Sequence, residues 1–315
     1  MCFSQKKHCV EKEINISLKY MNNSLVSVVI PTYNRQDSIL KAIESVLNQS
    51  YTNVEVIIVD DCSTDKTEEI VNKKYCTNSR VKYFCLQTNS GACVARNEGV
   101  RQSSGEYIAF LDSDDYYLPQ KVEKQIEMLQ RTSADLCVSD FIRQDKDGNE
   151  GIIKMFDGSR NEIYFQLLYC NYMTTGTLLG KKNCFIETPF DEELPRYQDW
   201  DLVLRLCQKY KFTSLHENTL VQIYQPVSIT ASTNHAKTLK ALSIVYNKNI
   251  EGYKRDKLAF TQIHWLMGLH NLYLNKKQAY KDLWIGVTHN GFNMKRFIIF
   301  VYARLGFIKL VSNNI

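Results

Sequence analysis

One cluster of oxygen-bearing side chains in the sequence could hold a divalent metal ion. Asp112, Ser113, Asp114 and Asp115 follow an apolar run at residues 107–111, which is typical of a buried strand. Two carboxylates one residue apart on a short turn are hard ligands that suit Mg²⁺ or Mn²⁺. Such an ion would hold a diphosphate and offset charge on a departing phosphate. The alternative interpretation is an acidic surface turn, since short patterns often match by chance.

Two further polar clusters end two other apolar runs, and both could contact a nucleobase. Thr32, Tyr33 and Asn34 follow the run at residues 26–30, and Asp61 follows the run at residues 54–59. The Tyr33 ring could stack on a base, and the Asp61 carboxylate could accept a hydrogen bond from a base N–H. The alternatives are a turn aromatic for Tyr33 and a helix cap for Asp61.

Alternating strand and helix patterns supply the elements that would position these clusters. They predict a mainly parallel sheet covered by helices on both faces, an α/β fold. Because ligands bind at the carboxyl ends of such strands, the three polar clusters should converge on one edge. The chain has neither a Gly-x-Gly-x-x-Gly fingerprint nor a Walker Gly-Lys-Ser/Thr sequence, which disfavours a Rossmann dinucleotide site and a P-loop. The strands are expected at residues 26–30, 54–59, 81–84, 107–111 and 134–138, and the helices from about residue 40, from 63–65, at 92–101 and at 120–129.

The second half of the chain offers fewer clear patterns. Residues 145–149 read as a hairpin tip, and residues 172–179 as a strand that lines the site. A helix is predicted to begin near Asp199, where the helix dipole favours a carboxylate. His216 and His235 are expected to be surface or hydrogen-bonded histidines rather than ligands.

Four ordered motifs resemble family 2 glycosyltransferases with the GT-A fold, over about residues 25–210. They are Val28-Val29-Ile30-Pro31-Thr32-Tyr33-Asn34, Val59-Asp60-Asp61-Cys62-Ser63-Thr64-Asp65, Gly91 with Ala95-Arg96-Asn97-Glu98-Gly99, and Phe110-Leu111-Asp112-Ser113-Asp114-Asp115. The resemblance implies a nucleotide-sugar donor, a divalent metal ion (Mn²⁺ or Mg²⁺) and inversion at the anomeric carbon.

The resemblance also implies roles for individual residues. Asp114, with Asp112, would bind the metal ion, and Asp199 would be the catalytic base. Gln198 stands where the family usually has Glu, so the charge beside the base differs. Arg96 would lie near the diphosphate, although its alternative is a solvated helix charge. The residues expected to bind the nucleotide-sugar are Pro31, Thr32, Tyr33, Asn34, Asp61, Arg96, Asp112 and Ser113.

The function that follows is an inverting hexosyltransferase of bacterial surface polysaccharide, such as O-antigen. It would move a hexose from a UDP-sugar to a saccharide on undecaprenyl diphosphate. The mechanism would be a metal-assisted single displacement with an Asp base. The alternatives are extension of a lipooligosaccharide core and a non-catalytic nucleotide-sugar-binding subunit.

The C-terminal region adds a partner to this prediction. Residues 237–315 carry 13 basic and 3 acidic residues, a net charge of +10. A basic, aromatic-rich helical region suits the anionic inner face of the bacterial inner membrane, which would make the protein cytoplasmic and peripheral. The alternative is a set of helices docked on the catalytic domain. Residues 224–228 fall where many relatives carry a basic or His-bearing loop, and the sequence assigns that loop no role here.

The composition agrees with a soluble globular chain and excludes several classes. Of 315 residues, 44% are hydrophobic and 23% charged, and the net charge of +5 is too small to predict a nucleic-acid partner. Ten cysteines include no Cys-x-x-Cys pair, which favours reduced core thiols over zinc or disulfides. The sequence contains no run of about 20 apolar residues, so it predicts no membrane-spanning helix.

The patterns together predict three regions. We expect a poorly ordered extension at residues 1–24 with Met21 as a candidate start, a GT-A catalytic domain at 25–235, and a basic helical region at 236–315.

Overall fold

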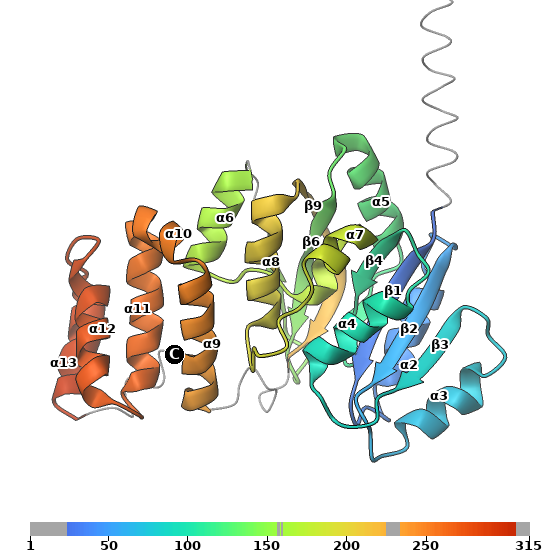
Figure 1. The fold of residues 1–315 in the computed structure, drawn as a ribbon, viewed down its shortest axis with the longest axis horizontal. Coiled ribbons are helices and arrows are strands. Elements are labelled where there is room, and N and C mark those ends of the chain that lie inside the picture. Colours follow the sequence, from blue (N-terminus) through green and yellow to red (C-terminus); the bar gives the residue numbers. More distant parts are fainter. Residues whose placement is uncertain (1–23, 156–157, 159, 225–233, 307–315) are drawn as a thin grey trace, which may run out of the picture. The chain divides into compact units, whose positions relative to one another are not determined.

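A computed structural model describes residues 24–155, 158, 160–224 and 234–306. The chain packs into two compact units, and each unit is made of segments that are not consecutive in the sequence (Figure 1). The sheet unit comprises residues up to 157, 173–190 and 209–224, and the helical unit comprises residues 158–172, 191–208 and 225 onward. This division reflects packing, so the functional boundaries at residues 24 and 235 stay predictions. The expected N-terminal extension, Met21 included, lies outside the described residues except for Ser24.

The described strands form one nine-stranded sheet in the order β3-β2-β1-β4-β8-β6-β9-β5, with β7 paired to β6. Strands β1 to β4 are parallel neighbours, and β6 and β9 also run parallel, whereas β8, β7 and β5 pair antiparallel. The predicted α/β fold is confirmed, with a sheet that is more mixed at one side than expected. The strands are β1 (Val26–Thr32), β2 (Val54–Asp60), β3 (Val81–Cys85), β4 (Tyr107–Phe110), β5 (Tyr116–Tyr117), β6 (Leu136–Gln144), β7 (Glu150–Ile153), β8 (Leu179–Lys181) and β9 (Phe212–Ile223).

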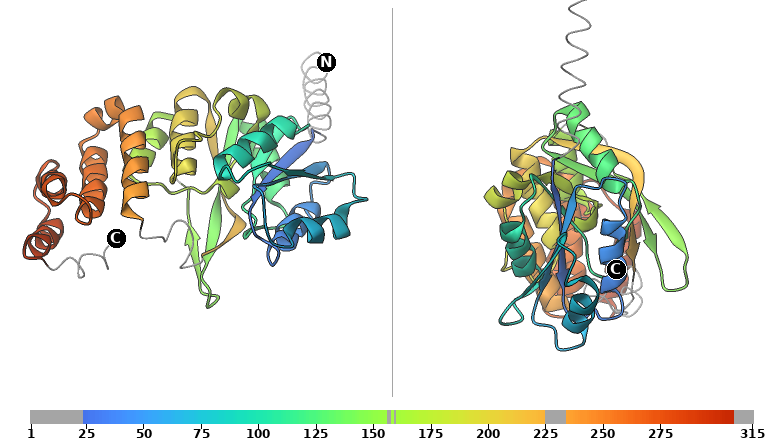
Figure 2. Two further views of the ribbon diagram at one scale, coloured as in Figure 1. Left: turned by 60° about the horizontal axis from the view of Figure 1, so that its bottom comes forward. Right: turned by 90° about the vertical axis from the view of Figure 1, so that its right-hand side faces the viewer.

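Helices cover both faces of the parallel strands. Helices α2 (Ile39–Leu47) and α4 (Ala92–Gln102) lie on opposite faces of the sheet (Figure 2), as right-handed crossovers in this strand order require. Strands β1 and β2 are buried along their whole length, as their continuous apolar runs predict. A Cβ on Gly99 would lie only 2.2 Å from the Val29 side chain, so glycine allows α4 to pack closely on β1. The other helices of this unit are α3 (Thr67–Tyr75), α5 (Lys121–Thr132) and α7 (Lys182–Glu187).

The expected strand at residues 172–179 is wrong. The segment contains a short 3₁₀ helix, η1 (Thr175–Thr177), and only Leu179 belongs to a strand. The Thr177 hydroxyl donates to the Thr174 carbonyl at 2.7 Å. Such local side-chain bonds compete with a strand ladder, which is why a threonine-rich segment can leave the sheet.

Two smaller expectations need correction as well. Pro31 does not end the first strand, because β1 continues through Thr32. The helix expected to open at residues 63–65 begins at Thr67, and Asp65 accepts the Thr67 N–H at 2.9 Å just before it. The hairpin tip at residues 145–149 is confirmed, since it joins β6 to β7.

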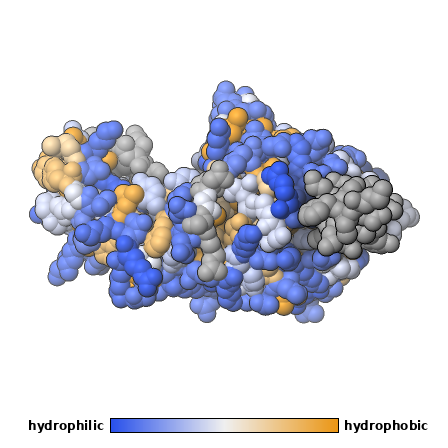
Figure 3. All heavy atoms as spheres, turned by 90° about the horizontal axis from the view of Figure 1, so that it is seen from above, coloured by the Kyte–Doolittle hydropathy of each residue, from blue (hydrophilic) through white to orange (hydrophobic). Residues whose placement is uncertain are grey.

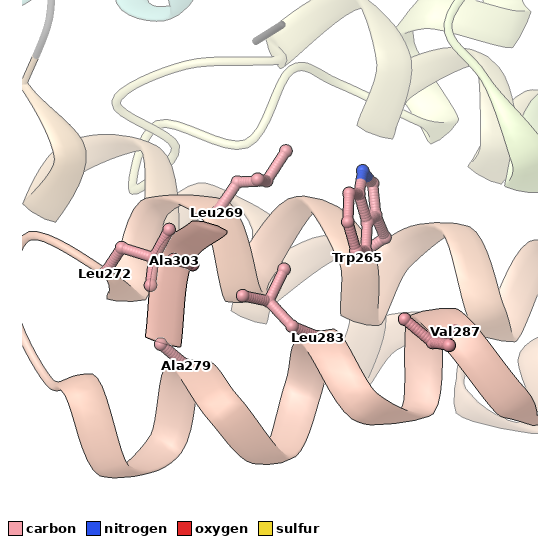
Figure 4. Packing of buried hydrophobic residues seen from close by; sticks show 7 residues of the cluster. All are labelled: Trp265, Leu269, Leu272, Ala279, Leu283, Val287 and Ala303. Carbon is pink, nitrogen blue, oxygen red and sulfur yellow. The ribbon is translucent and has the colours of Figure 1, made fainter. Parts of the chain in front are cut away.

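The helical unit has its own core. Helices α11 (Lys257–Asn271), α12 (Lys276–Thr288) and α13 (Met294–Arg304) enclose Trp265, Leu269 and Leu283 together with smaller apolar side chains (Figure 4). The remaining helices of this unit are α6 (Arg160–Tyr169), α8 (Gln198–Lys209), α9 (His235–Lys248) and α10 (Ile250–Arg255). Among the described helices, none has the length and apolar character to cross a bilayer.

Cysteines in the described part of the chain are free thiols. Cys93, Cys137, Cys184 and Cys207 are buried, as core thiols should be, whereas Cys76 and Cys85 are exposed. The expectation of core thiols therefore holds for four of these residues, and the two exposed ones depart from it.

Lys121 is buried in the sheet unit, and among the described residues no carboxylate lies at hydrogen-bonding distance from it. Its ammonium faces Gln125 Oε1, the Thr177 carbonyl at 3.5 Å and the ring of Tyr117 at 4.8 Å. Burial lowers the pKa of Lys121 to about 7. The unfolded chain therefore binds one more proton than the native state between pH 7 and the ordinary lysine pKa, and this group makes stability rise with pH over that window.

We expect Lys121→Met to stabilise the protein most at pH 7 and below. The difference in free energy of unfolding between this variant and the wild type should decrease by about 1.4 kcal/mol for each pH unit above 7. Urea unfolding at several pH values between 7 and 9 measures this, with Lys124→Met, which alters a partly exposed lysine of the same helix, as the control. A difference that does not change with pH would mean that Lys121 stays charged in the fold.

Candidate active site

The loops that follow β1 and β2 are tied together at the carboxyl edge of the sheet. Thr32 and Asp60 are register partners at the strand ends. Asn34 adopts a left-handed conformation (φ 52°), its Oδ1 accepts the Thr64 N–H at 2.8 Å, and its own N–H donates to Ser63 Oγ at 2.8 Å. Asn34 thus joins the two loops, a role that the nucleotide-binding prediction did not include.

The side chains on either side of Asn34 differ in exposure. Tyr33 is 43% exposed, which leaves its ring accessible to a base. Pro31 and Thr32 are buried, and the Thr32 hydroxyl has no hydrogen-bond partner within the described residues. A buried polar atom without a partner is costly. The end of β1 therefore offers a hydrogen-bonding group next to an exposed aromatic ring.

Asp61 fixes the loop that leads into α4. Its two carboxylate oxygens accept the backbone N–H groups of Ser90 at 2.6 Å and Gly91 at 2.8 Å. Gly91 has a positive φ of 93°, which favours glycine there. Asp61 is not the cap of α3, since Asp65 accepts the N–H of Thr67 there. The helix-cap interpretation of Asp61 is therefore wrong.

We expect Asp61→Asn to weaken UDP binding by roughly tenfold to a hundredfold. The amide N–H₂ of an asparagine would face one of the two backbone N–H groups that the Asp61 carboxylate now accepts, so that hydrogen bond would be lost. Hydrogen bonds to a charged group contribute about 1.5–3 kcal/mol each. Titration calorimetry with UDP measures the change. The control is Asp65→Asn, because Asp65 also bonds loop amides but lies outside the predicted nucleotide site. Equal losses in both variants would indicate a purely architectural role.

A buried Arg96 and a partly exposed Asp112 form an ion pair. The Arg96 Nη2 atom lies 2.7 Å from Asp112 Oδ1, and the guanidinium lies 5.3 Å over the Phe190 ring. Arg96 is only 7% exposed, so the interpretation of a solvated helix charge is wrong. Thr175 Oγ1 lies 3.5 Å from the same Asp112 oxygen. The α4 helix and the η1 segment therefore both hold the first carboxylate of the acidic cluster.

The remaining acidic residues of the cluster crowd negative charge at the end of β4. Burial, and then the charge of Asp112, raise the pKa of Asp114. Burial, and then Asp112 and Asp114, raise the pKa of Asp115, whose carboxylate accepts the Ile223 N–H at 2.8 Å. Arg35 contacts Asp114 at 3.4 Å, and Ser113 is buried between the acids. The acidic cluster is thus partly buried, not a simple surface turn.

This donor set fits a divalent cation. A cation would favour the charged form of Asp114, which burial and the nearby charge of Asp112 disfavour here. In the described part of the chain, no three side chains of the usual ligand types converge. Such a site suits an ion that completes its coordination with diphosphate oxygens and water, as Mg²⁺ commonly does.

The predicted base lies in the helical unit, in the first turn of α8. Asp199 Oδ1 accepts the Trp200 N–H at 2.8 Å. Trp200 is buried and its indole N–H donates to the Leu167 carbonyl at 2.6 Å. Gln198 Nε2 donates to the Leu194 carbonyl at 3.2 Å. These bonds fix the start of α8, and the meeting of Asp199 with the acidic cluster stays a prediction.

Asp201 anchors the same helical turn to α9. Asp201 is fully buried, and it pairs with Arg205 at 2.7 Å and with Lys248 at 2.9 Å. Lys248 also contacts Asp191 at 2.5 Å. A buried carboxylate with two cationic partners is costly to disturb. This network was not anticipated, because Lys248 is distant in sequence.

Both histidines singled out in the sequence have partners. His216 lies 3.6 Å from Asp140, and His235 Nδ1 lies 2.9 Å from His270 Nδ1 with its ring stacked on Tyr273. The expectation of hydrogen-bonded histidines is confirmed for His235. Of the loop at residues 224–228, only Tyr224 is described, and the rest lies outside the described residues.

The sequence analysis did not name Arg35, and it gave Asp115 and Thr175 no individual role although both lie in segments that it singled out. Arg35 directly follows a recognised motif, so proximity in sequence was a usable signal. Thr175 approaches Asp112 only because η1 leaves the expected strand geometry.

Fold and site together define a glycosyltransferase of the GT-A type. Residues 27–189 match the family described as "Glycosyl transferase family 2". The chain therefore belongs to glycosyltransferase family 2.

Relatives of known sequence support this assignment. An uncharacterized glycosyltransferase of Haemophilus influenzae is 30% identical over 82% of this chain and 100% of that protein. The putative teichuronic acid biosynthesis glycosyltransferase TuaG of Bacillus subtilis is 34% identical over 76% of this chain and 92% of its own length. The UDP-Glc:alpha-D-GlcNAc-diphosphoundecaprenol beta-1,3-glucosyltransferase WfaP of Escherichia coli is 33% identical over 68% of this chain and 82% of its own length.

Solved structures share the fold. Staphylococcus aureus TarS (residues 1–349) aligns with a TM-score of 0.60 and 20% identity, over 91% of this chain and 89% of that one. The Pyrobaculum calidifontis mannosyltransferase PcManGT, solved with GDP-Man and Mn²⁺, aligns with a TM-score of 0.60 and 16% identity, over 92% of this chain and 83% of its own.

Proposed function

We propose that the chain is an inverting hexosyltransferase that uses a UDP-sugar and a saccharide acceptor linked to undecaprenyl diphosphate. The product would be a repeat unit of a bacterial surface polysaccharide such as O-antigen. The observation that carries the proposal is the Arg96–Asp112 pair beside Asp114 at the carboxyl end of β4. This arrangement places the Arg96 guanidinium, which could bind a diphosphate, next to the Asp112 and Asp114 carboxylates, which could bind a metal ion. WfaP, whose name gives both a UDP-glucose donor and a diphosphoundecaprenol acceptor, supports the substrate class.

The donor would bind across the loops of the sheet unit. Tyr33 offers a ring for stacking on the base, Asp61 holds the adjoining loop, and the buried Thr32 hydroxyl offers a hydrogen bond. Asp112 and Asp114 would hold Mn²⁺ or Mg²⁺, which supplies Lewis-acid stabilisation of the departing diphosphate. Arg96 would add positive charge near the same group.

The acceptor hydroxyl is a weak nucleophile, so it needs a base. Asp199 would take the hydroxyl proton as the new C–O bond forms at the anomeric carbon and the bond to the nucleoside diphosphate breaks. One in-line displacement inverts that carbon and leaves UDP with the electron pair of the broken bond. The mechanism requires no covalent intermediate with the protein.

We also propose that the protein works at the inner face of the bacterial inner membrane, where a lipid-linked acceptor is held. The basic C-terminal region supports this location.

A donor and acceptor screen tests the proposed function. The purified chain is incubated with UDP-, GDP- and dTDP-hexoses and Mn²⁺ or Mg²⁺. The acceptor is a GlcNAc-diphosphate-lipid or, in parallel, lipooligosaccharide core, and the product is analysed by mass spectrometry and NMR. We expect transfer from a UDP-hexose, loss of transfer with EDTA, and an inverted anomeric carbon. Transfer only from GDP- or dTDP-sugars, a retained configuration, or activity only on lipooligosaccharide core would overturn the corresponding part of the proposal.

A further inference from the structure

Helix α13 carries an apolar stripe on its outward side. Met294, Ile298 and Tyr302 of α13 and its C-cap residue Leu305, which keeps a helical backbone conformation, are spaced by four, four and three residues. They therefore share one side of a helix with 3.6 residues per turn. We call these four residues the α13 stripe. Their exposed fractions are 61%, 48%, 44% and 66%. Single exposed apolar residues are common on protein surfaces, but a continuous row of four large exposed apolar side chains is not.

The opposite side of α13 packs on the rest of the helical unit. Ala303 is buried in the cluster around Trp265 and Leu283, and Phe297 and Phe300 pack against that cluster (Figure 4). The Phe300 ring centroid lies 5.4 Å from that of Trp284 on α12, which is itself 46% exposed. The core of the unit is therefore formed without the α13 stripe. Hydrophobic side chains are visible at the end of the molecule that carries these helices (Figure 3, left).

Cations border the α13 stripe, and no surface carboxylate of α12 or α13 opposes them. By the helical period, Lys295 and Arg304 fall on its two sides, and both are exposed. Lys277 and Lys281 are exposed on α12. Asp282 is the single acidic residue between positions 257 and 315. It is buried and pairs with His264 at 2.9 Å.

We propose that the α13 stripe is the face by which this chain binds an anionic lipid bilayer. An exposed apolar row flanked by Lys and Arg, with Trp and Tyr beside it, matches the pattern of a helix that lies in the membrane interface. The cations complement anionic headgroups, with about 1 kcal/mol for each Lys or Arg near the surface. A second copy of the chain would bring like charges together on this face, so the charge pattern favours lipid. This inference rests on the proposed location at the membrane and assigns the membrane contact to one face of one helix. Membrane binding can be measured without sugar transfer, so it can be tested separately from the enzymatic activity.

Vesicle flotation of the full chain tests the proposal. Vesicles of phosphatidylethanolamine and phosphatidylglycerol are compared with vesicles of phosphatidylcholine. We expect the wild type to float with the anionic vesicles, and the triple variant Ile298→Ser/Tyr302→Ser/Leu305→Ser to bind them on the order of a hundredfold more weakly. Lys295→Gln/Arg304→Gln should bind about tenfold more weakly. The control is Ile152→Ser/Ile186→Ser, which alters two residues of the sheet unit that are 59% and 56% exposed, and its binding should be unchanged.

Three results would overturn the proposal. The first is equal flotation of the wild type and the triple variant. The second is a dimer in light scattering that dissociates in the triple variant while vesicle binding stays the same, which would assign the stripe to a second copy. The third is binding only after truncation at Gly306, which would assign it to the chain's own last nine residues. Activity on a soluble acceptor, measured in parallel, keeps a failure of membrane binding separate from a failure of the proposed function.

Discussion

Asp199→Asn is expected to lower the rate of sugar transfer by about a thousandfold or more and to leave the affinity for UDP-sugar near that of the wild type. General base catalysis contributes roughly 10²–10⁴ to a rate, and an amide cannot take the acceptor proton. The substitution keeps the side-chain oxygen that accepts the Trp200 N–H, so the start of α8 should stay intact. Single-turnover kinetics and calorimetric titration of the donor measure the two quantities separately.

The matched control for this experiment is Glu193→Gln, which neutralises an exposed carboxylate a few residues before α8. Its transfer rate should equal that of the wild type. A wild-type rate in Asp199→Asn would exclude Asp199 as the base. A parallel loss of donor affinity would instead mean that Asp199 contributes to donor binding, which contradicts the proposed role as well.

Asp114→Asn is expected to remove most of the Mn²⁺-dependent part of UDP binding, with an affinity about a hundredfold lower. A neutral amide is a weaker ligand for a hard cation than a carboxylate. The same change removes one of three crowded negative charges, so thermal stability in EDTA should not fall. Calorimetry with UDP and Mn²⁺, together with thermal unfolding in EDTA, measures both effects.

The two readouts separate a metal-binding role of Asp114 from a structural one. Asp147→Ala, at the exposed hairpin tip between β6 and β7, serves as the control and should change neither of them. Unchanged binding heat in Asp114→Asn would contradict the metal role. Reduced stability in EDTA would show that Asp114 supports the fold instead.

Local sequence patterns were sufficient for the parallel strands and for the positions of the acidic residues after them. β-Branched runs bounded by polar residues placed β1, β2 and β4 to within two residues at each end. They also placed Asp61 and Asp112 at the carboxyl edge, because parallel strands end on the same side. The motifs that resemble family 2 then supplied the enzyme class, which the comparisons confirmed.

Features that depend on distant contacts could not be predicted in the same way. The burial of Arg96 arises from Asp112 and Phe190, which lie in other segments. The 3₁₀ helix η1 forms where threonine side chains bond to the local backbone, although their β propensity favours a strand. The association of α6 and α8 with the C-terminal helices depends on packing that no local pattern records.

The Asp201–Lys248 pair has a practical consequence for any shortened version of this enzyme. A fragment that stopped at residue 235, the expected end of the catalytic domain, would lack Lys248. It would leave Asp201 enclosed with Arg205 as its remaining cationic partner, directly behind the turn that carries Asp199. We therefore expect a folded fragment to need α9, because Lys248 supplies the second cationic partner of Asp201 at the start of α8.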